Sequence, residues 1–164
     1  MTRLHRTFLL TWNPDSEEGN PKDFDVEMGI TQEEGLRVVW PWRTGSRTDL
    51  PEGSRVFLLK QGRPPRGIIA SGWSITEPPG EPSADFEFTM VLDWDKGQIL
   101  PEKLLKEEFP EFNWHPAGGG VSLAAFDKRL EYLWVDELHR HDLQEALGKM
   151  GWFRSKLFAW YRRM

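Results

Sequence analysis

The residues of this chain that could do chemistry are mainly aromatic. Nine of the 164 residues are tryptophan and none is cysteine. Four of the indoles stand in or at the end of short β-prone runs, as Trp12, Trp40, Trp42 and Trp73. Flat indole faces stack on planar bases or hold methylated groups, and stacking is worth about 1–3 kcal/mol per base. The pattern indicates a binding pocket, and filling one end of a β-barrel is the alternative use of the same rings.

Polar and basic side chains accompany these rings. Asparagine and serine near the tryptophans can read a base edge, whereas guanidinium groups match the geometry and charge of phosphates. The residues assigned to the base pocket are Trp12, Asn13, Trp42, Ser71 and Trp73. The residues assigned to the nucleic-acid backbone are Arg43, Arg47, Lys60, Arg63 and Arg66, for which a solvated surface is the alternative.

The sequence gives little support for catalysis or metal binding. The four histidines show no metal-ligand spacing, and the lack of cysteine removes thiolate ligands and cysteine nucleophiles. The stretch "HPAGGG" (115–120) lacks the lysine and hydroxyl residue of a P-loop, so it predicts a turn. No nucleophile-elbow pattern supports a catalytic serine. We therefore expect no metal, no cofactor and no enzymatic activity in this chain.

Charge is unevenly distributed along the chain. The formal net charge is −5, which argues against indiscriminate polyanion binding. Residues 15–34 hold eight acidic side chains against one lysine, whereas residues 37–66 hold seven basic side chains against two acidic ones. We expect the basic stretch to lie near the pocket and the acidic stretch to face away from phosphates. An acidic gate that weakens binding of unmodified DNA is the alternative.

Hydrophobic patterning predicts strands in the first part of the chain. Runs of apolar and β-branched residues, separated by Pro, Gly and Asn turns, predict strands at 7–12, 35–40, 55–60, 68–75 and 85–94. The third and fourth of these should form a hairpin. The last alternates apolar and polar residues, which indicates a strand with one buried face.

Helices are predicted after these strands. One spans 101–109, a second begins at Ser122 as its N-cap, and a third begins at Asp142. Strands followed by helices predict an α+β fold with a mixed sheet or small barrel. We expect one domain over 1–138, with 139–164 as a C-terminal helix packed on it or extending from it. No apolar stretch approaches 18 residues, so we expect a cytoplasmic protein without membrane contact.

Three stretches together resemble the EVE-type domain of the PUA-like superfamily. They are "TFLLTWNP" (7–14), "WRTGSR" (42–47) and "LPEGSRVFLLKQGRPPRGIIASGW" (50–73). The segment "GGGVSLAAFDKRLEYLW" (118–134) is similar to the closing segment of that family. The resemblance covers about residues 5–135, and its most specific part is 53–73. It is strongest to the version that precedes HNH nuclease modules in modification-dependent restriction enzymes.

This resemblance implies a PUA-like, EVE/YTH-like distorted mixed β-barrel of about five to six strands flanked by helices. In those restriction systems the domain reads a modified cytosine that is flipped out of DNA into an aromatic cage, while a separate module cuts. The five pocket residues named above carry over, and Trp40 has no counterpart. The chain lacks the His-Trp pair that often follows the "ASG" strand. It also lacks an HNH motif, so cleavage would require a nuclease partner or fusion.

The expected function is therefore binding of DNA that carries a 5-substituted cytosine, by base flipping into the tryptophan pocket. Two alternatives remain open at this stage. PUA-like domains commonly read modified RNA, and the related ASCH type would make the chain a hydrolase of RNA or of a small amide.

Overall fold

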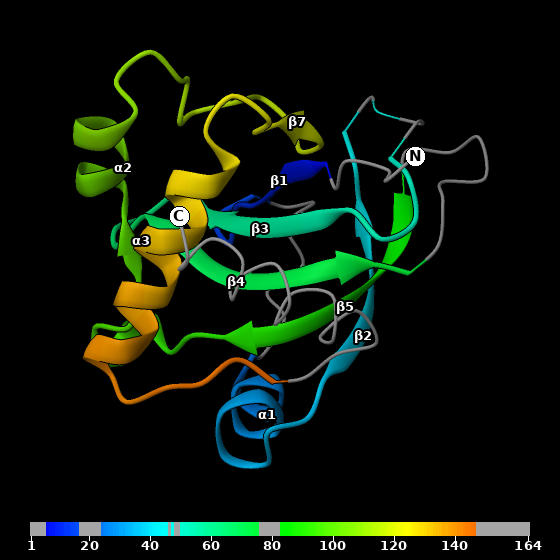
Figure 1. Cartoon of the computed structure of the whole chain (residues 1–164), viewed down its shortest axis with the longest axis vertical. Coiled ribbons are helices and arrows are strands. Elements are labelled where there is room, and N and C mark those ends of the chain that lie inside the picture. The colour runs from blue at the N-terminus through cyan, green and yellow to red at the C-terminus, as the bar shows by residue number, and fades with distance from the viewer. Residues whose placement is uncertain (1–5, 17–23, 46, 48–49, 76–82, 147–164) are drawn as a thin grey trace, which may run out of the picture.

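A mixed sheet of seven strands organises the chain. This computed structural model describes residues 6–16, 24–45, 47, 50–75 and 83–146. The strands are β1 (Thr7–Trp12), β2 (Val38–Arg43), β3 (Arg55–Lys60), β4 (Gly67–Ser74), β5 (Ser83–Val91), β6 (Leu100–Pro101) and β7 (Val121–Ser122). Their spatial order is β2-β5-β4-β3-β1-β7, with β6 beside β4 (Figure 1). β1 and β3 are parallel, and the other pairs are antiparallel.

The helices are short, with one exception. They are α1 (Asp25–Met28), the π-helical η1 (Gly29–Glu33), the 3-10 turn η2 (Trp94–Lys96), α2 (Glu102–Glu108) and α3 (Asp127–Arg140). The chain is therefore α+β, as the sequence predicts. None of the helices described has the length and hydrophobicity to cross a bilayer.

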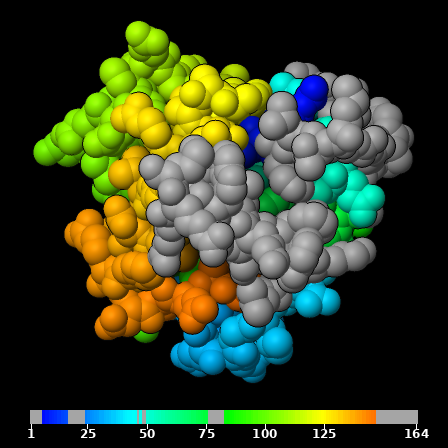
Figure 2. Space-filling model, viewed as in Figure 1, coloured from blue at the N-terminus to red at the C-terminus, as the bar shows by residue number. Residues whose placement is uncertain are grey.

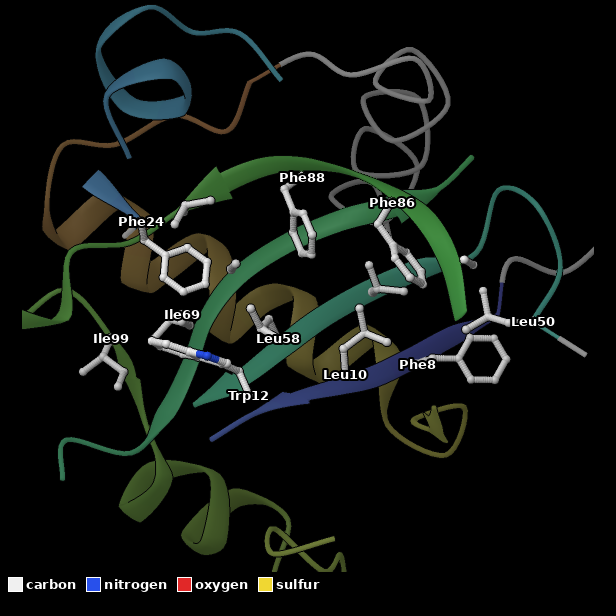
Figure 3. Close-up of a cluster of buried hydrophobic side chains, with 14 residues drawn as sticks. Phe8, Leu10, Trp12, Phe24, Leu50, Leu58, Ile69, Phe86, Phe88 and Ile99 are labelled. Carbon is white, nitrogen blue, oxygen red and sulfur yellow. The ribbon is translucent and has the colours of Figure 1, made fainter. Parts of the chain in front are cut away.

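The two faces of the sheet carry separate hydrophobic cores. Side chains along a strand alternate between faces, so Phe8, Leu10 and Trp12 of β1 point into a first core while Leu9 points into a second. α2 and α3 cover the second core with Leu105 and Trp134 among others. Figure 3 shows the first core in front of the sheet and α3 behind it. A residue on β3 or β4 therefore faces either the first core or α3.

Most of the strand predictions are confirmed, with shifts at their ends. β1 and β3 have the predicted bounds, and β3 and β4 form the predicted antiparallel hairpin. β2 starts three residues later than expected and continues through Pro41. This is tolerated because β2 is an edge strand, where a missing N–H costs no ladder bond. The prediction that 85–94 has one buried face is wrong, because Glu87 and Thr89 are buried as well.

The prediction that α3 begins at Ser122 is wrong. Val121 and Ser122 pair with β1 as a short strand, and α3 begins only at Asp127. The helix ends at Arg140. No helix starts at Asp142, because residues 143–146 are irregular and Ala146 N–H donates to Thr89 C=O at 2.8 Å. The remainder of that predicted helix, residues 147–164, lies outside the described residues.

Candidate functional site

Five aromatic rings gather at one end of the first core. This aromatic cluster consists of Trp12, Phe24, Trp40, Trp42 and Trp94. The Phe24 ring lies at its centre, with ring centroids 4.6 Å from Trp12, 4.9 Å from Trp40 and 5.6 Å from Trp94. All three contacts are edge-to-face, with interplanar angles of 70°, 73° and 81°. Edge-to-face packing is a favoured arrangement of aromatic pairs.

These rings come from segments far apart in the sequence. Trp12 ends β1, and Trp40 and Trp42 share one face of β2 because they are two residues apart. Trp94 begins η2, two residues beyond the end of β5, and Phe24 immediately precedes α1. In Figure 3, Trp12 and Phe24 lie at the end of the first core opposite Phe8.

Curling of the sheet brings β1 and β2 together, although β3, β4 and β5 separate them in the strand order. The Trp42 indole Nε1–H donates to the Thr11 carbonyl at 3.1 Å. Gly119 lies between these two strands, where an added Cβ would be 3.3 Å from Thr11 N and 3.4 Å from Arg43 O. The cluster therefore lies beside the line along which the two strands approach each other.

One polar group in the cluster is unsatisfied. The Trp12 side chain is only 6 % exposed, and its Nε1–H has no hydrogen-bond partner among the described residues. A buried donor left without an acceptor costs about 1–3 kcal/mol. An acceptor on a ligand that entered the cluster would satisfy this N–H.

Ser71 and Trp73 lie on the other face of the sheet. The Ser71 hydroxyl makes a short hydrogen bond to the Glu145 carboxylate. The Arg55 guanidinium lies 5.0 Å from the Trp73 ring centroid and pairs with Glu131 at 2.7 Å and Glu145 at 3.0 Å. Since Glu131 belongs to α3, this network faces the helices. The structure therefore brings Trp12 and Trp42 together but separates Ser71 and Trp73 from them.

Asn13 lies next to the cluster in a turn. Its Oδ1 accepts a hydrogen bond of 2.9 Å from Asp15 N–H and lies against Gly62, so a Cβ at position 62 would clash with it. Asp15 in turn accepts a hydrogen bond from Arg63 N–H. Asp15 thus links the turn after β1 to the loop that follows β3, and the Asn13 side-chain oxygen accepts a hydrogen bond within that turn.

Lys60 is buried rather than exposed to phosphates. Its side chain is 4 % exposed, and Nζ donates hydrogen bonds of 2.8 Å to the carbonyls of both Arg63 and Pro65. Burial removes water from the ammonium group and lowers the pKa of Lys60. Nζ also lies 6.0 Å from the centroid of the Trp94 ring. The residue therefore shapes the loop after β3 and places a cation beside the aromatic cluster.

The four arginines assigned to the backbone differ in exposure. Arg43, Arg63 and Arg66 are exposed, and the Arg63 guanidinium is 3.5 Å from Asp15 with 82 % of its side chain accessible. Arg66 pairs with the largely buried Glu102 at 3.0 Å. Arg47 is half-buried, hydrogen-bonds the Gly120 carbonyl and lies 4.7 Å from the Phe8 ring centroid. Arg63 thus presents the most accessible guanidinium of the loop after β3.

A cavity of about 700 Å³ lies along the glycine-rich segment. Its lining residues are Arg47, Phe112, Asn113 and 116–122. It does not include any ring of the aromatic cluster. The described residues contain no group of three or more His, Asp or Glu side chains placed to hold a metal ion. The predicted turn at 115–120 is confirmed, because these residues form bends between α2 and β7.

Three members of the cluster were not assigned to the pocket from the sequence. Trp40 had no counterpart in the resemblance, Trp94 ends the strand predicted at 85–94, and Phe24 lies inside the acidic stretch. A tryptophan at the end of an alternating strand was the available signal for Trp94. Nothing local marks Phe24, because its partners are contributed by β1, β2 and η2.

Figure 2 shows α1 and η1 as a projecting part of the surface, beside the last described residues of the chain.

Comparisons of the chain with protein-family models, with curated proteins and with solved structures find no match. The case for a function therefore depends on the geometry of the site and on the resemblance in its motifs.

Proposed function

We propose that this chain is a nucleic-acid-binding module that recognises a modified base, a 5-substituted cytosine in DNA, flipped into the aromatic cluster. The observation that carries the proposal is the indole N–H of Trp12, which is buried among four other aromatic rings and has no partner among the residues that the structure describes. A base supplies both an aromatic face for these rings and ring or carbonyl acceptors for the indole donor. Flipping a base costs a few kcal/mol, which stacking in a closed pocket can offset.

The curvature of the sheet supports the EVE-type, PUA-like barrel on which the proposal rests. Contact between β1 and β2 across three intervening strands is what closure of a mixed sheet requires. The cluster then lies at one end of the curled sheet, where the resemblance puts the base pocket. Trp12 and Trp42 keep their assigned roles, Trp94 and Trp40 join them, and Ser71 and Trp73 do not.

The charges around the cluster favour a neutral ligand. The Lys60 ammonium already lies near the Trp94 ring, so a second cation would meet repulsion in a poorly solvated place. A methylated ammonium group is therefore a poor ligand, although aromatic cages elsewhere suit it. A neutral, planar base avoids this repulsion.

Backbone contacts would come from the loop after β3. Gln61 N–H donates to Trp12 C=O at 2.8 Å, so this loop begins beside the cluster. The Lys60 ammonium donates hydrogen bonds to two main-chain carbonyls of this loop, and the Arg63 side chain extends into solvent. Lys60 is thereby a positioning residue, while Arg43, Arg63 and Arg66 are the exposed cations that would contact phosphates.

A competition assay tests the proposal. A labelled DNA duplex with one 5-methylcytosine is bound to the full chain, and binding is followed by fluorescence anisotropy. Unlabelled duplexes of the same sequence, with and without the methyl group, and an RNA oligonucleotide with the same modification compete for the protein. We expect the methylated DNA to compete best. Equal competition by the two duplexes would contradict recognition of the modified base. Stronger competition by the RNA would mean that RNA, rather than DNA, is the ligand.

A further inference from the structure

We infer that Phe24 occupies the base pocket in the free protein, as an internal occupant that an incoming base has to displace. The inference rests on the proposed function. It concerns the size of the ligand ring and the state of the pocket before binding, neither of which follows from the presence of tryptophans alone.

The first reason is the position of the ring. Phe24 touches Trp12, Trp40 and Trp94, and these three indoles surround it from β1, β2 and η2. The ring is 2 % exposed, so it fills the space between the indoles. A ligand ring cannot reach the same three indoles while Phe24 is there.

The second reason is that the Phe24 ring leaves the pocket chemically incomplete. The phenylalanine side chain has no hydrogen-bond acceptor, so it leaves the buried Nε1–H of Trp12 without a partner among the described residues. A pyrimidine also has one six-membered ring, but it carries oxygen and nitrogen acceptors. Exchange of Phe24 for a pyrimidine keeps the aromatic contacts and pairs the donor. A purine has a second ring for which the space held by Phe24 makes no allowance.

The third reason is how the segment that carries Phe24 is attached. At its far end, Val91 N–H donates to Thr31 Oγ1 at 3.1 Å, and Gln32 Nε2 donates to Val91 O at 2.7 Å. At its near end, no described side chain caps α1, Val26 is 63 % exposed, and the Phe24 carbonyl accepts from Met28 N–H at 2.9 Å within the helix. Thr31 and Gln32 can therefore keep η1 on β5 while the ring of Phe24 leaves the cluster.

The test compares Phe24→Leu with Phe86→Leu. Leucine at position 24 removes the edge-to-face contacts that hold the occupant, so displacement becomes easier and more of the protein is competent to bind. Phe86 belongs to the same core but lies at the end away from Phe24, so its substitution lowers stability without changing occupancy of the pocket (Figure 3). Affinity is measured for the duplex with 5-methylcytosine and for free 5-methylcytidine.

We expect Phe24→Leu to bind both probes about tenfold more tightly than the unsubstituted chain, and Phe86→Leu to bind them unchanged. If the unsubstituted chain prefers methylated DNA but Phe24→Leu binds it equally or more weakly, Phe24 is a wall of the pocket. The inference then fails and the proposed function stands. If neither protein prefers methylated DNA, both fail.

A second measurement does not depend on a substitution that alters packing. 4-Fluorophenylalanine is placed at position 24, and its ¹⁹F signal is followed while the methylated duplex is added. We expect the signal to move to the position of a solvent-exposed ring and to gain a solvent isotope shift. A bound complex with an unchanged, buried ¹⁹F signal overturns the inference.

Discussion

The indole nitrogen of Trp42 donates a hydrogen bond of 3.1 Å to the main-chain carbonyl of Thr11. This bond joins an edge strand to a strand four positions away in the sheet order. Trp12, the next residue along β1, has the same donor group but no acceptor among the described residues. Of these two indoles in one cluster, the first donates to the main chain, whereas the second has a donor that no described group accepts from.

The first prediction concerns that group. Trp12→Phe keeps an aromatic ring but removes the N–H. The smaller ring leaves a cavity, and removal of the unsatisfied donor offsets part of that cost, so we expect a net loss of about 1–2 kcal/mol in the free energy of unfolding. Loss of a ligand hydrogen bond should weaken binding of methylated DNA about five- to tenfold. Urea denaturation and anisotropy titrations measure the two effects.

Trp134→Phe is the matched control. Trp134 is fully buried in the second core and its Nε1–H also lacks a partner among the described residues. The same substitution there should cost similar stability but leave DNA binding unchanged. Equal losses of affinity in the two variants would mean that the effect at Trp12 comes from stability alone.

Ser71→Ala tests which face of the sheet binds. The Ser71 hydroxyl donates to Glu145, which also accepts from Thr89 Oγ1 at 2.6 Å and pairs with Arg55. Loss of a buried hydrogen bond to a charged group should lower the free energy of unfolding by about 1.5–3 kcal/mol. Affinity for methylated DNA should not change, because Ser71 faces α3. A loss of affinity for methylated DNA without a loss of stability would indicate that Ser71 contacts the base.

Local patterns in the sequence were sufficient for most elements but not for the site. β1 and β3 could be predicted because a buried strand bounded by turns is visible within six residues. The start of α3 could not, since pairing of Val121 and Ser122 with β1 is a contact between distant segments. The turn at Gly118–Gly120 was predicted from composition, but its packing against Gly45 was not.

The sequence did not show which of the assigned residues share a face of the sheet. Trp12 and Trp42 lie in one cluster, and each is at or near the end of a strand. Ser71 and Trp73 lie on the other face, because sequence spacing does not tell which face a residue takes after a register shift. The pairing of β4 with β5 has such a shift between Ser71 and Gly72. Lys60 looked exposed, since its carbonyl partners lie in a loop whose conformation the sequence does not give.

Gly45→Ala tests the packing of the segment after β2 against the glycine-rich segment 118–120. Gly45 has φ of +64°, and a Cβ there would overlap the carbonyl oxygen of Gly119. Gly35 has a similar φ of +66° but no atom within 4 Å of the added Cβ. Gly35→Ala should therefore cost only the backbone strain, about 1 kcal/mol. Gly45→Ala should cost about 2 kcal/mol more, measured by urea denaturation. Equal losses of stability in the two variants would show that the glycine-rich segment can move enough to accommodate a methyl group at position 45.

Lys60 gives the protein a pH dependence. Its pKa in the folded chain is lower than the ordinary value of 10.5, because the ammonium is buried. Between these two pKa values the unfolded chain binds more protons, so the free energy of unfolding rises with pH through that interval. We compare the unsubstituted chain with Lys60→Met by urea denaturation from neutral pH to about 10.5. As pH rises, the free energy of unfolding of the unsubstituted chain should increase relative to that of Lys60→Met. A constant difference would mean that Lys60 keeps its ordinary pKa.

Arg63→Gln tests the backbone contact through its dependence on salt. The slope of log K against log salt concentration changes by about 0.9 for each DNA phosphate that a cation neutralises. Arg63→Gln should therefore weaken binding to methylated and unmethylated duplexes alike and reduce the slope by about one. Arg129→Gln is the matched control, since Arg129 is likewise exposed and paired with a carboxylate, Glu108, at 3.0 Å, but belongs to α3. Its slope should equal that of the unsubstituted chain. A reduced slope in both variants would indicate a nonspecific effect of net charge, because the two substitutions remove the same charge from different surfaces.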